Sequence, residues 1–154
     1  MFETPKRMRL TVASLFILAI APALSASGGE VRDSDLVIPA GEVSSRARYY
    51  SAVIEGYSLQ LFAVTAPDET IRVVFNACQA CGPAGFTQDK DSMVCSACRQ
   101  RFKLSDLERQ RGGCNPIPVG EKNRSRNANG DIVISRAFLK QVKDYFSRQW
   151  PRGI

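Results

Sequence analysis

The cysteines of this chain are spaced in a way that is typical of metal binding or thiol chemistry. The sequence of 154 residues has five, and four of them form two Cys-x-x-Cys pairs in the stretch NACQACGPAGFTQDKDSMVCSACRQRF. In a Cys-x-x-Cys turn both sulfurs can face one point while backbone N–H groups donate hydrogen bonds to them. Two pairs separated by a dozen or so residues therefore complete a four-thiolate metal site. The predicted ligands are Cys78, Cys81, Cys95 and Cys98.

The spacing leaves the metal open, and it leaves other thiol chemistry open. Cysteines of an exported protein meet an oxidising compartment, so the pairs are also compatible with disulfides or a thioredoxin-like site. No helical pattern follows either pair, which argues against a thiol–disulfide oxidoreductase. A further alternative is a structural zinc or disulfide staple in an interaction module, since CSACRQRF resembles the second knuckle of a zinc ribbon.

The chain contains no His. This excludes Ser-His-Asp and Cys-His catalysis, His-ligated zinc and the Cys-x-x-Cys-His haem attachment. Met93 is the only Met after the N-terminal segment, which argues against a Met-rich copper site. A metal bound here must be held by sulfur, with carboxylate or backbone help at most.

The fifth cysteine, Cys114, lies in the stretch GGCNPIPV. Gly112 and Gly113 allow close backbone approach, and Asn115-Pro116 favours an extended exit. A backbone so constrained predicts a thiol held at a fixed point, and we expect its sulfur within about 7 Å of another cysteine sulfur. Three roles are open: a replacement ligand in a cluster site, a disulfide partner, or a buried structural residue.

The N-terminus has the pattern of a targeting segment. Lys6, Arg7 and Arg9 precede an apolar run over residues 10–24, which is short for a bilayer span of about 20 residues, and small residues follow. Residues 1–26 are therefore predicted to be a signal peptide or an N-terminal membrane anchor, with one domain over residues 27–154. The expected location is the periplasm or cell envelope, with membrane association possible through the N-terminal segment.

The formal net charge of +6 is compatible with binding nucleic acid. An exported protein rarely meets nucleic acid, however, so the charge indicates a solvated surface and no nucleic-acid partner is expected.

Three strand-like runs precede the cysteines, over residues 46–54, 57–65 and 70–76. Short gaps between them predict an antiparallel meander. In the second run, Leu59, Leu61 and Ala63 alternate with a second face that includes Phe62. Residues 27–35 are a polar stretch, and the cysteine region is predicted to be loop-rich because it contains many Gly and Pro residues.

A strand is predicted at residues 132–134, and Ser135 is predicted to cap a helix from residue 136 to about 149, ended by Pro151. Phe138, Val142 and Phe146 form its apolar stripe, which together with Tyr145 and Trp150 we expect to pack in the core. The expected fold class is α+β: a small antiparallel β meander, a loop-rich cysteine metal lobe and a C-terminal helix.

The run from IRVVFNACQAC through CSACRQRF to GGCNPIPV resembles the FtrD-like family of membrane or exported iron–sulfur proteins. The resemblance covers roughly residues 36–146 in element order. It implies a cysteine-ligated iron–sulfur cluster or metal, with all five cysteines on the family pattern. It also implies an association with iron-permease uptake systems, in which such a protein handles electrons or metal.

Three positions depart from the family pattern. Asn76 replaces a common Asp, Phe86 replaces a common Tyr, and Arg99 replaces a common Gly. The last argues against a left-handed residue after Cys98, because only Gly takes a positive φ without cost. Lys6-Arg7 is an imperfect version of the twin-arginine signal that exports folded iron–sulfur proteins, so zinc stays an alternative cofactor. The expected function is that of a non-enzymatic accessory protein of iron uptake or electron transfer.

Overall fold

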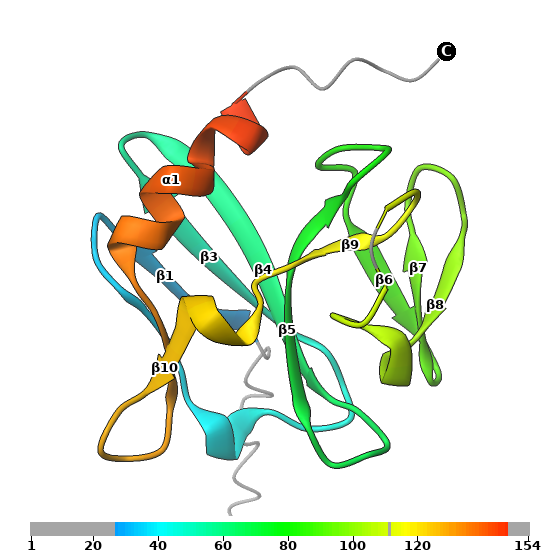
Figure 1. The fold of residues 1–154 in the computed structure, drawn as a ribbon, viewed down its shortest axis with the longest axis horizontal. Helices are drawn as coiled ribbons and strands as arrows, with labels where there is room; N and C mark the ends of the chain where they lie inside the picture. The colour runs from blue at the N-terminus through cyan, green and yellow to red at the C-terminus, as the bar shows by residue number, and fades with distance from the viewer. Residues whose placement is uncertain (1–26, 111, 148–154) are drawn as a thin grey trace, which may run out of the picture.

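The structure is a computed structural model of the chain that describes residues 27–110 and 112–147 (Figure 1). The predicted signal peptide or anchor over residues 1–26 lies outside the described residues. So do Trp150, Pro151 and the predicted end of the helix.

A five-stranded sheet forms the centre of the molecule, in the order β1-β3-β4-β5-β9. Its strands are β1 (Ser27–Arg32), β3 (Arg48–Ile54), β4 (Tyr57–Thr65), β5 (Ile71–Cys78) and β9 (Pro116–Pro118). Strands β3, β4 and β5 form the predicted antiparallel meander. The β3–β4 turn consists of Glu55 and Gly56, both with positive φ, as a tight two-residue hairpin requires.

Two three-stranded antiparallel sheets lie on either side of the central sheet. One has the order β10-β11-β2, formed by β10 (Arg124–Arg126), β11 (Ile132–Ile134) and β2 (Leu36–Ile38). The other has the order β6-β7-β8, formed by β6 (Phe86–Asp89), β7 (Ser92–Cys95) and β8 (Arg101–Lys103). We call residues 78–115, which contain β6, β7 and β8, the cysteine lobe; its strands form the right-hand part of Figure 1.

The helix α1 (Arg136–Ser147) follows β11 and starts at the predicted cap. The hydroxyl of Ser135 accepts a hydrogen bond from the N–H of Phe138 at 3.2 Å. Three short 3-10 helices, Ala40–Glu42, Leu104–Asp106 and Glu121–Asn123, connect the strands. The α+β class, with antiparallel strands, a cysteine cluster and a C-terminal helix, is confirmed.

Two features of the fold were not predicted from the sequence. The polar stretch after residue 26 contains β1, which pairs in parallel with β3 and is the one parallel neighbour among the described strands. Phe62, on the face of β4 opposite Leu61, is fully buried because the cysteine lobe covers that face. The cysteine lobe is loop-rich, as predicted, and its short strands β6, β7 and β8 pair into one small sheet.

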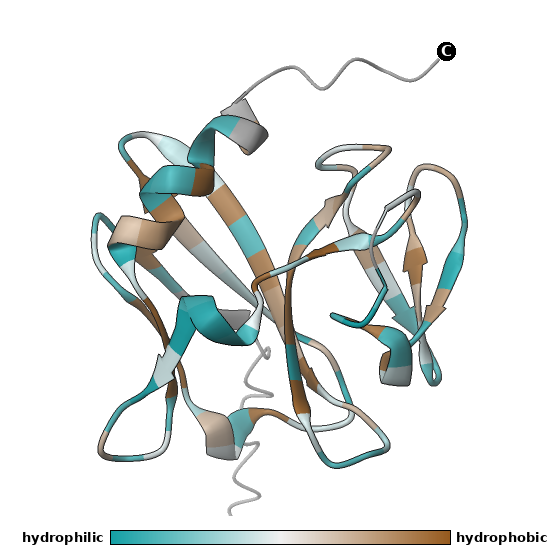
Figure 2. Cartoon of the chain, in the orientation of Figure 1, coloured by the Kyte–Doolittle hydropathy of each residue, from teal (hydrophilic) through white to brown (hydrophobic). Residues whose placement is uncertain are grey.

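Two hydrophobic cores lie on opposite faces of the central sheet. The first packs residues of β3, β4 and β5 against β2, β11 and α1, and it includes Leu61, Phe75 and Leu139. The second packs Phe62 and Val74 against the cysteine lobe. Hydrophobic residues accordingly run along β4 and β5 in Figure 2. The central strands therefore connect the helical side of the molecule with the cysteines.

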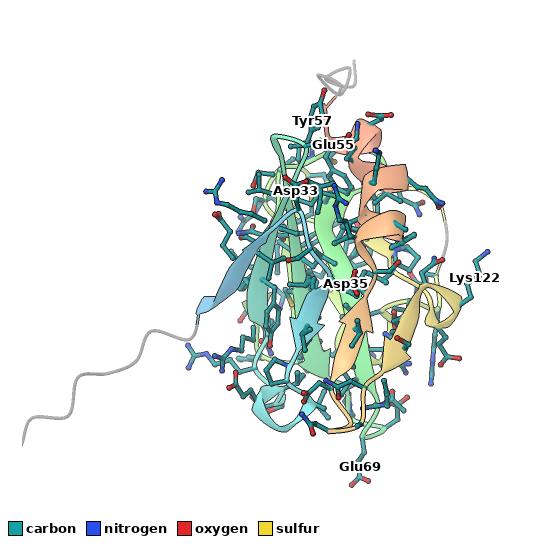
Figure 3. All side chains as sticks on the ribbon, turned by 90° about the vertical axis from the view of Figure 1, so that its left-hand side faces the viewer. Asp33, Asp35, Glu55, Tyr57, Glu69 and Lys122 are labelled. Atoms are coloured by element: carbon teal, nitrogen blue, oxygen red, sulfur yellow. The ribbon has the colours of Figure 1, made fainter. Side chains whose placement is uncertain are left out.

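The helix α1 packs on the central sheet through its apolar side and forms ion pairs with the β3–β4 turn through its charged side. Phe138 and Phe146 pack on Phe75, with ring centroids 6.2 and 5.0 Å apart, so the predicted stripe is confirmed where side chains are described. Glu55 lies beside the helix in Figure 3. Its carboxylate forms ion pairs with the ammonium groups of Lys140 at 2.5 Å and Lys143 at 3.2 Å. The side chains of Tyr145 and Trp150 lie outside the description.

A row of aromatic rings connects the central sheet to the cysteine lobe. The ring centroid of Phe62 lies 5.7 Å from that of Tyr49 and 6.3 Å from that of Phe86. Phe86 in turn lies 5.9 Å from Phe102. The hydroxyl of Tyr49 donates a hydrogen bond to the carbonyl oxygen of Phe86 at 2.8 Å. The strands that bear the cysteines thus rest on this row.

Phe62→Leu is expected to lower the free energy of unfolding by about 1–2 kcal/mol, a fraction of the 3–5 kcal/mol typical of Phe→Ala in a core. Urea unfolding measures the change. Tyr57→Leu, at a residue that is 39% exposed, is the control and should cost less than about 1 kcal/mol. Equal losses in the two variants would contradict the packing of Phe62 between sheet and lobe.

Candidate metal centre

The first cysteine pair forms a tight backbone turn at the end of β5. The N–H of Cys78 donates to the carbonyl oxygen of Gly82 at 2.8 Å, and the N–H of Gly82 donates back at 2.9 Å. Gly82 has a φ of 75°, which Gly adopts without a steric penalty. The reciprocal bonds close the turn around Cys81, and we call residues 78–82 the first knuckle.

The second pair forms the same kind of turn between β7 and β8. The N–H of Arg99 donates to the carbonyl oxygen of Cys95 at 3.0 Å, and the N–H of Cys95 donates to the carbonyl oxygen of Gln100 at 3.0 Å. Arg99 has a φ of 64°. The expectation that Arg99 disfavours a left-handed residue after Cys98 was therefore wrong. The hydrogen bonds of the turn impose that conformation, and we call residues 95–99 the second knuckle.

The two knuckles and Cys114 bring all five sulfurs together in two overlapping groups. Within the group Cys78, Cys81 and Cys95, all sulfurs lie within 4.8 Å of one another. The same holds within the group Cys81, Cys98 and Cys114. We call these the inner and outer groups, because Cys78 and Cys95 are buried and Cys98 is exposed. Cys81 belongs to both groups and connects them.

Cys114 lies where the sequence predicted, close to the paired cysteines. Its sulfur is 3.3 Å from that of Cys98 and 3.7 Å from that of Cys81. These distances are well inside the expected limit and well beyond the 2.05 Å of a disulfide bond, so all five cysteines are free thiols. The proximity is confirmed, and the role of Cys114 as a ligand stays a prediction.

The loop that carries Cys114 is fixed to the first knuckle by Gln79, for which no role was predicted from the sequence. The N–H of Gln79 donates to the carbonyl oxygen of Asn115 at 2.9 Å, and the side-chain oxygen of Gln79 accepts from the N–H of Gly112 at 2.8 Å. The buried side chain of Asn115 donates to the carbonyl oxygen of Gln110. The position of Gln79 between Cys78 and Cys81 was the one feature of the sequence that could have indicated this role.

Asn76 has a comparable structural role at the start of β6. Its side-chain oxygen accepts a hydrogen bond from the N–H of Phe86 at 2.7 Å, and its amide nitrogen donates to the side-chain oxygen of Gln60 at 2.6 Å. Asn76 therefore links β4, β5 and β6 just before the first knuckle, which orients the two cysteine-bearing hairpins relative to each other.

The thiols differ in acidity for local reasons. The N–H of Gln100 donates to the sulfur of Cys98 and lowers the pKa of that thiol to about 7. Burial raises the pKa of Cys81 and of Cys95. Contact with the sulfur of Cys98 raises the pKa of Cys114 to about 11. Metal binding at these residues must therefore displace protons from most of the thiols.

The donor set fits the groups that thiolates bind. Ligands about 2.3 Å from one tetrahedral metal ion lie about 3.8 Å apart, which is similar to the spacing within the two sulfur groups. Iron–sulfur clusters are likewise held by four Cys thiolates. Cys78, Cys81, Cys95 and Cys98 would hold either kind of centre, with Cys114 beside it. The arrangement is a lobe of five clustered thiols, compatible with metal binding, attached to a β-sheet domain.

The family comparison agrees with this site. The family described as membrane iron-sulfur containing protein FtrD-like matches residues 43–146, which include both knuckles and Cys114. The chain therefore belongs to the FtrD-like family. Within residues 27–110 and 112–147, no helix is long and apolar enough to cross a membrane.

Solved structures also match, at low similarity. One is the crystal structure of the quaternary ammonium Rieske monooxygenase CntA in complex with an inhibitor, with a TM-score of 0.44 and 15% sequence identity. The match covers 73% of this chain and 35% of that chain, so this chain spans about a third of the length of the monooxygenase. A comparison with curated proteins finds no significant match.

Arg99→Gly is expected to raise the free energy of unfolding by about 0.5–1 kcal/mol, because Gly takes the left-handed conformation without the penalty that Arg carries there. Thermal or urea unfolding of the full chain measures the change.

Arg101→Gly, two residues further on in β8, is the matched control for the Arg99 substitution. It should lower the same free energy, because Gly weakens a strand. Destabilisation by Arg99→Gly as large as that by Arg101→Gly would contradict the assignment of strain to Arg99.

Proposed function

We propose that this chain is an exported accessory protein that holds a cysteine-ligated iron–sulfur centre at the cell envelope and serves iron uptake or electron transfer. The observation that carries the proposal is the convergence of the two knuckles, from separate hairpins, on one cluster of thiols in a member of the FtrD-like family.

The ligands of the proposed centre are Cys78, Cys81, Cys95 and Cys98. When bound, an iron–sulfur cluster supplies one-electron transfer, at a potential set by hydrogen bonds to its sulfurs and by solvent exposure. Here the N–H of Gln100 donates to the sulfur of Cys98, and backbone groups of the second knuckle donate to that of Cys95. These bonds stabilise negative charge on the thiolates.

The burial pattern suits a centre that exchanges electrons or metal with a partner. Cys78 and Cys95 face the second core beside Phe86 and Phe102, which keeps water from the inner side. Cys98 is exposed, so the outer side can approach another protein. The partners in this proposal are components of an envelope iron-permease system, in line with the family name. The proposed role is not enzymatic.

Export is proposed from the basic and apolar N-terminal segment over residues 1–26, which is either cleaved or kept as a membrane anchor. The family description as a membrane protein supports a place at the membrane surface.

Zinc is the alternative cofactor, and one observation favours it. Sulfur separations of 4.8 Å or less within each group are close to those around a single tetrahedral ion. A zinc centre would make the cysteine lobe a structural interaction module.

Deleting the gene in its native host should impair growth when iron is scarce, and added iron should restore growth, because the proposed centre serves iron uptake. A plasmid copy of the wild-type gene should also restore growth, whereas Cys78→Ser should not, since loss of one thiolate opens the coordination shell. Ser105→Ala, in the same lobe, is the control and should restore growth fully.

Restoration by Cys78→Ser would contradict a role for the centre in iron uptake. The rival function, thiol–disulfide exchange, is measured by reduction of insulin disulfides with the purified protein. Strong turnover in that assay without an iron-dependent growth defect would favour the oxidoreductase.

A further inference from the structure

The cluster contains one thiol more than the proposed centre uses. A tetrahedral ion or a cluster of the family type takes four thiolates, and the two knuckles supply them. Cys114 is nevertheless as close to Cys81 and Cys98 as ligands of a common metal are to each other. The extra thiol is thus placed against the outer edge of the centre.

The outer group has the geometry of a three-thiolate site. Three ligands about 2.3 Å from one ion are separated by about 4 Å when the ion lies in their plane. The sulfur of Cys114 lies 3.3 Å from that of Cys98 and 3.7 Å from that of Cys81, and all three lie within 4.8 Å of one another. Small shifts of the side chains therefore suffice for a common ion to contact all three sulfurs.

The site is preorganised, because contacts from three directions hold the loop of Cys114. Gln79 binds it through its backbone N–H and its side-chain oxygen, as described above. Before the loop, Arg109 forms an ion pair with Asp68 at 2.7 Å, and the half-buried Glu108 forms one with Arg124 at 3.0 Å. The third cysteine therefore needs no folding step to reach the other two, which lowers the entropic cost of binding.

The outer group is also accessible. Cys98 is exposed, and Cys81 and Cys114 are half-buried, whereas Cys78 and Cys95 are fully enclosed. An ion can therefore enter and leave at the outer group without opening the second core. Thiolate ligands with no nitrogen or oxygen donor suit Cu(I), Zn²⁺ and iron–sulfur clusters, and Cu(I) is the softest single ion of these.

We propose that Cys81, Cys98 and Cys114 bind a second, exchangeable soft metal ion of the Cu(I) type. Cys81 and Cys98 act as thiolates shared with the first centre, and Cys114 is the ligand that belongs to the second ion alone. The inference deepens the proposed function and rests on it for the first centre, because sharing requires that centre to be in place.

The test is an anaerobic titration of the full reduced chain, carrying its native metal, with Cu(I) in competition with a chromophoric Cu(I) chelator. Wild-type protein should take up one Cu(I) per chain without releasing its native metal. Cys114→Ser should bind that Cu(I) at least tenfold more weakly and keep the native metal, since only the second ion depends on Cys114.

Gln79→Ala should weaken Cu(I) binding severalfold, because it frees the loop of Cys114 without removing a thiol. Gln141→Ala removes an exposed glutamine of α1, which packs on the opposite face of the central sheet, and should bind like the wild type. Gln79 is thus tested as a positioning residue.

Equal Cu(I) affinity and stoichiometry in the wild type and Cys114→Ser would overturn the second site, as would release of one native metal for each Cu(I) bound. Failure of the first centre is recognised separately. In that case the purified wild-type protein contains no native metal, and Cys78→Ser does not change its metal content.

Discussion

The β4–β5 strand pair is buried on both of its faces. On one face, Leu61 and Phe75 pack against α1 and the sheet that contains β2 and β11. On the other face, Phe62 and Val74 pack against the cysteine lobe. Because β5 ends at Cys78, the strand that joins the two cores also delivers the first sulfur. The packing of the domain and the position of the cysteine cluster are therefore coupled through one strand.

The sulfur positions depend on backbone geometry more than on side-chain packing. Each knuckle closes by reciprocal or near-reciprocal backbone hydrogen bonds and continues through a left-handed residue, Gly82 in the first and Arg99 in the second. Because Arg99 adopts the left-handed conformation, the hydrogen bonds of the second knuckle must offset a steric penalty of about 1–2 kcal/mol. The third contributor, the loop of Cys114, reaches the knuckles through hydrogen bonds to Gln79.

Local patterns were sufficient to predict much of this fold from the sequence. The meander, the strand at residues 132–134 and the cap at Ser135 depend on alternation and capping, which adjacent residues determine. The spacing of the cysteines likewise predicted the cluster, and the Gly-Gly-Cys-Asn-Pro stretch predicted that Cys114 lies near it.

The features that the sequence did not reveal depend on contacts between distant segments. Strand β1 is polar because it lies at the edge of its sheet, so no apolar pattern marked it. Phe62 is buried only because a lobe formed later in the chain covers it. The contacts of Gln79 join residues more than 30 positions apart, and no local pattern reports such a pairing.

In this member of the FtrD-like family, a β-sheet domain thus holds a cluster of thiols at an accessible edge of its central strands. X-ray absorption at the metal edge, combined with analysis of inorganic sulfide in protein purified without air, is the sharpest test of an iron–sulfur centre at these thiols. We expect iron with a first shell of sulfur only, iron–iron scattering, and inorganic sulfide in proportion to the iron. Zinc without sulfide would contradict the iron–sulfur assignment, and metal-free protein with two Cys-x-x-Cys disulfides would contradict the centre itself.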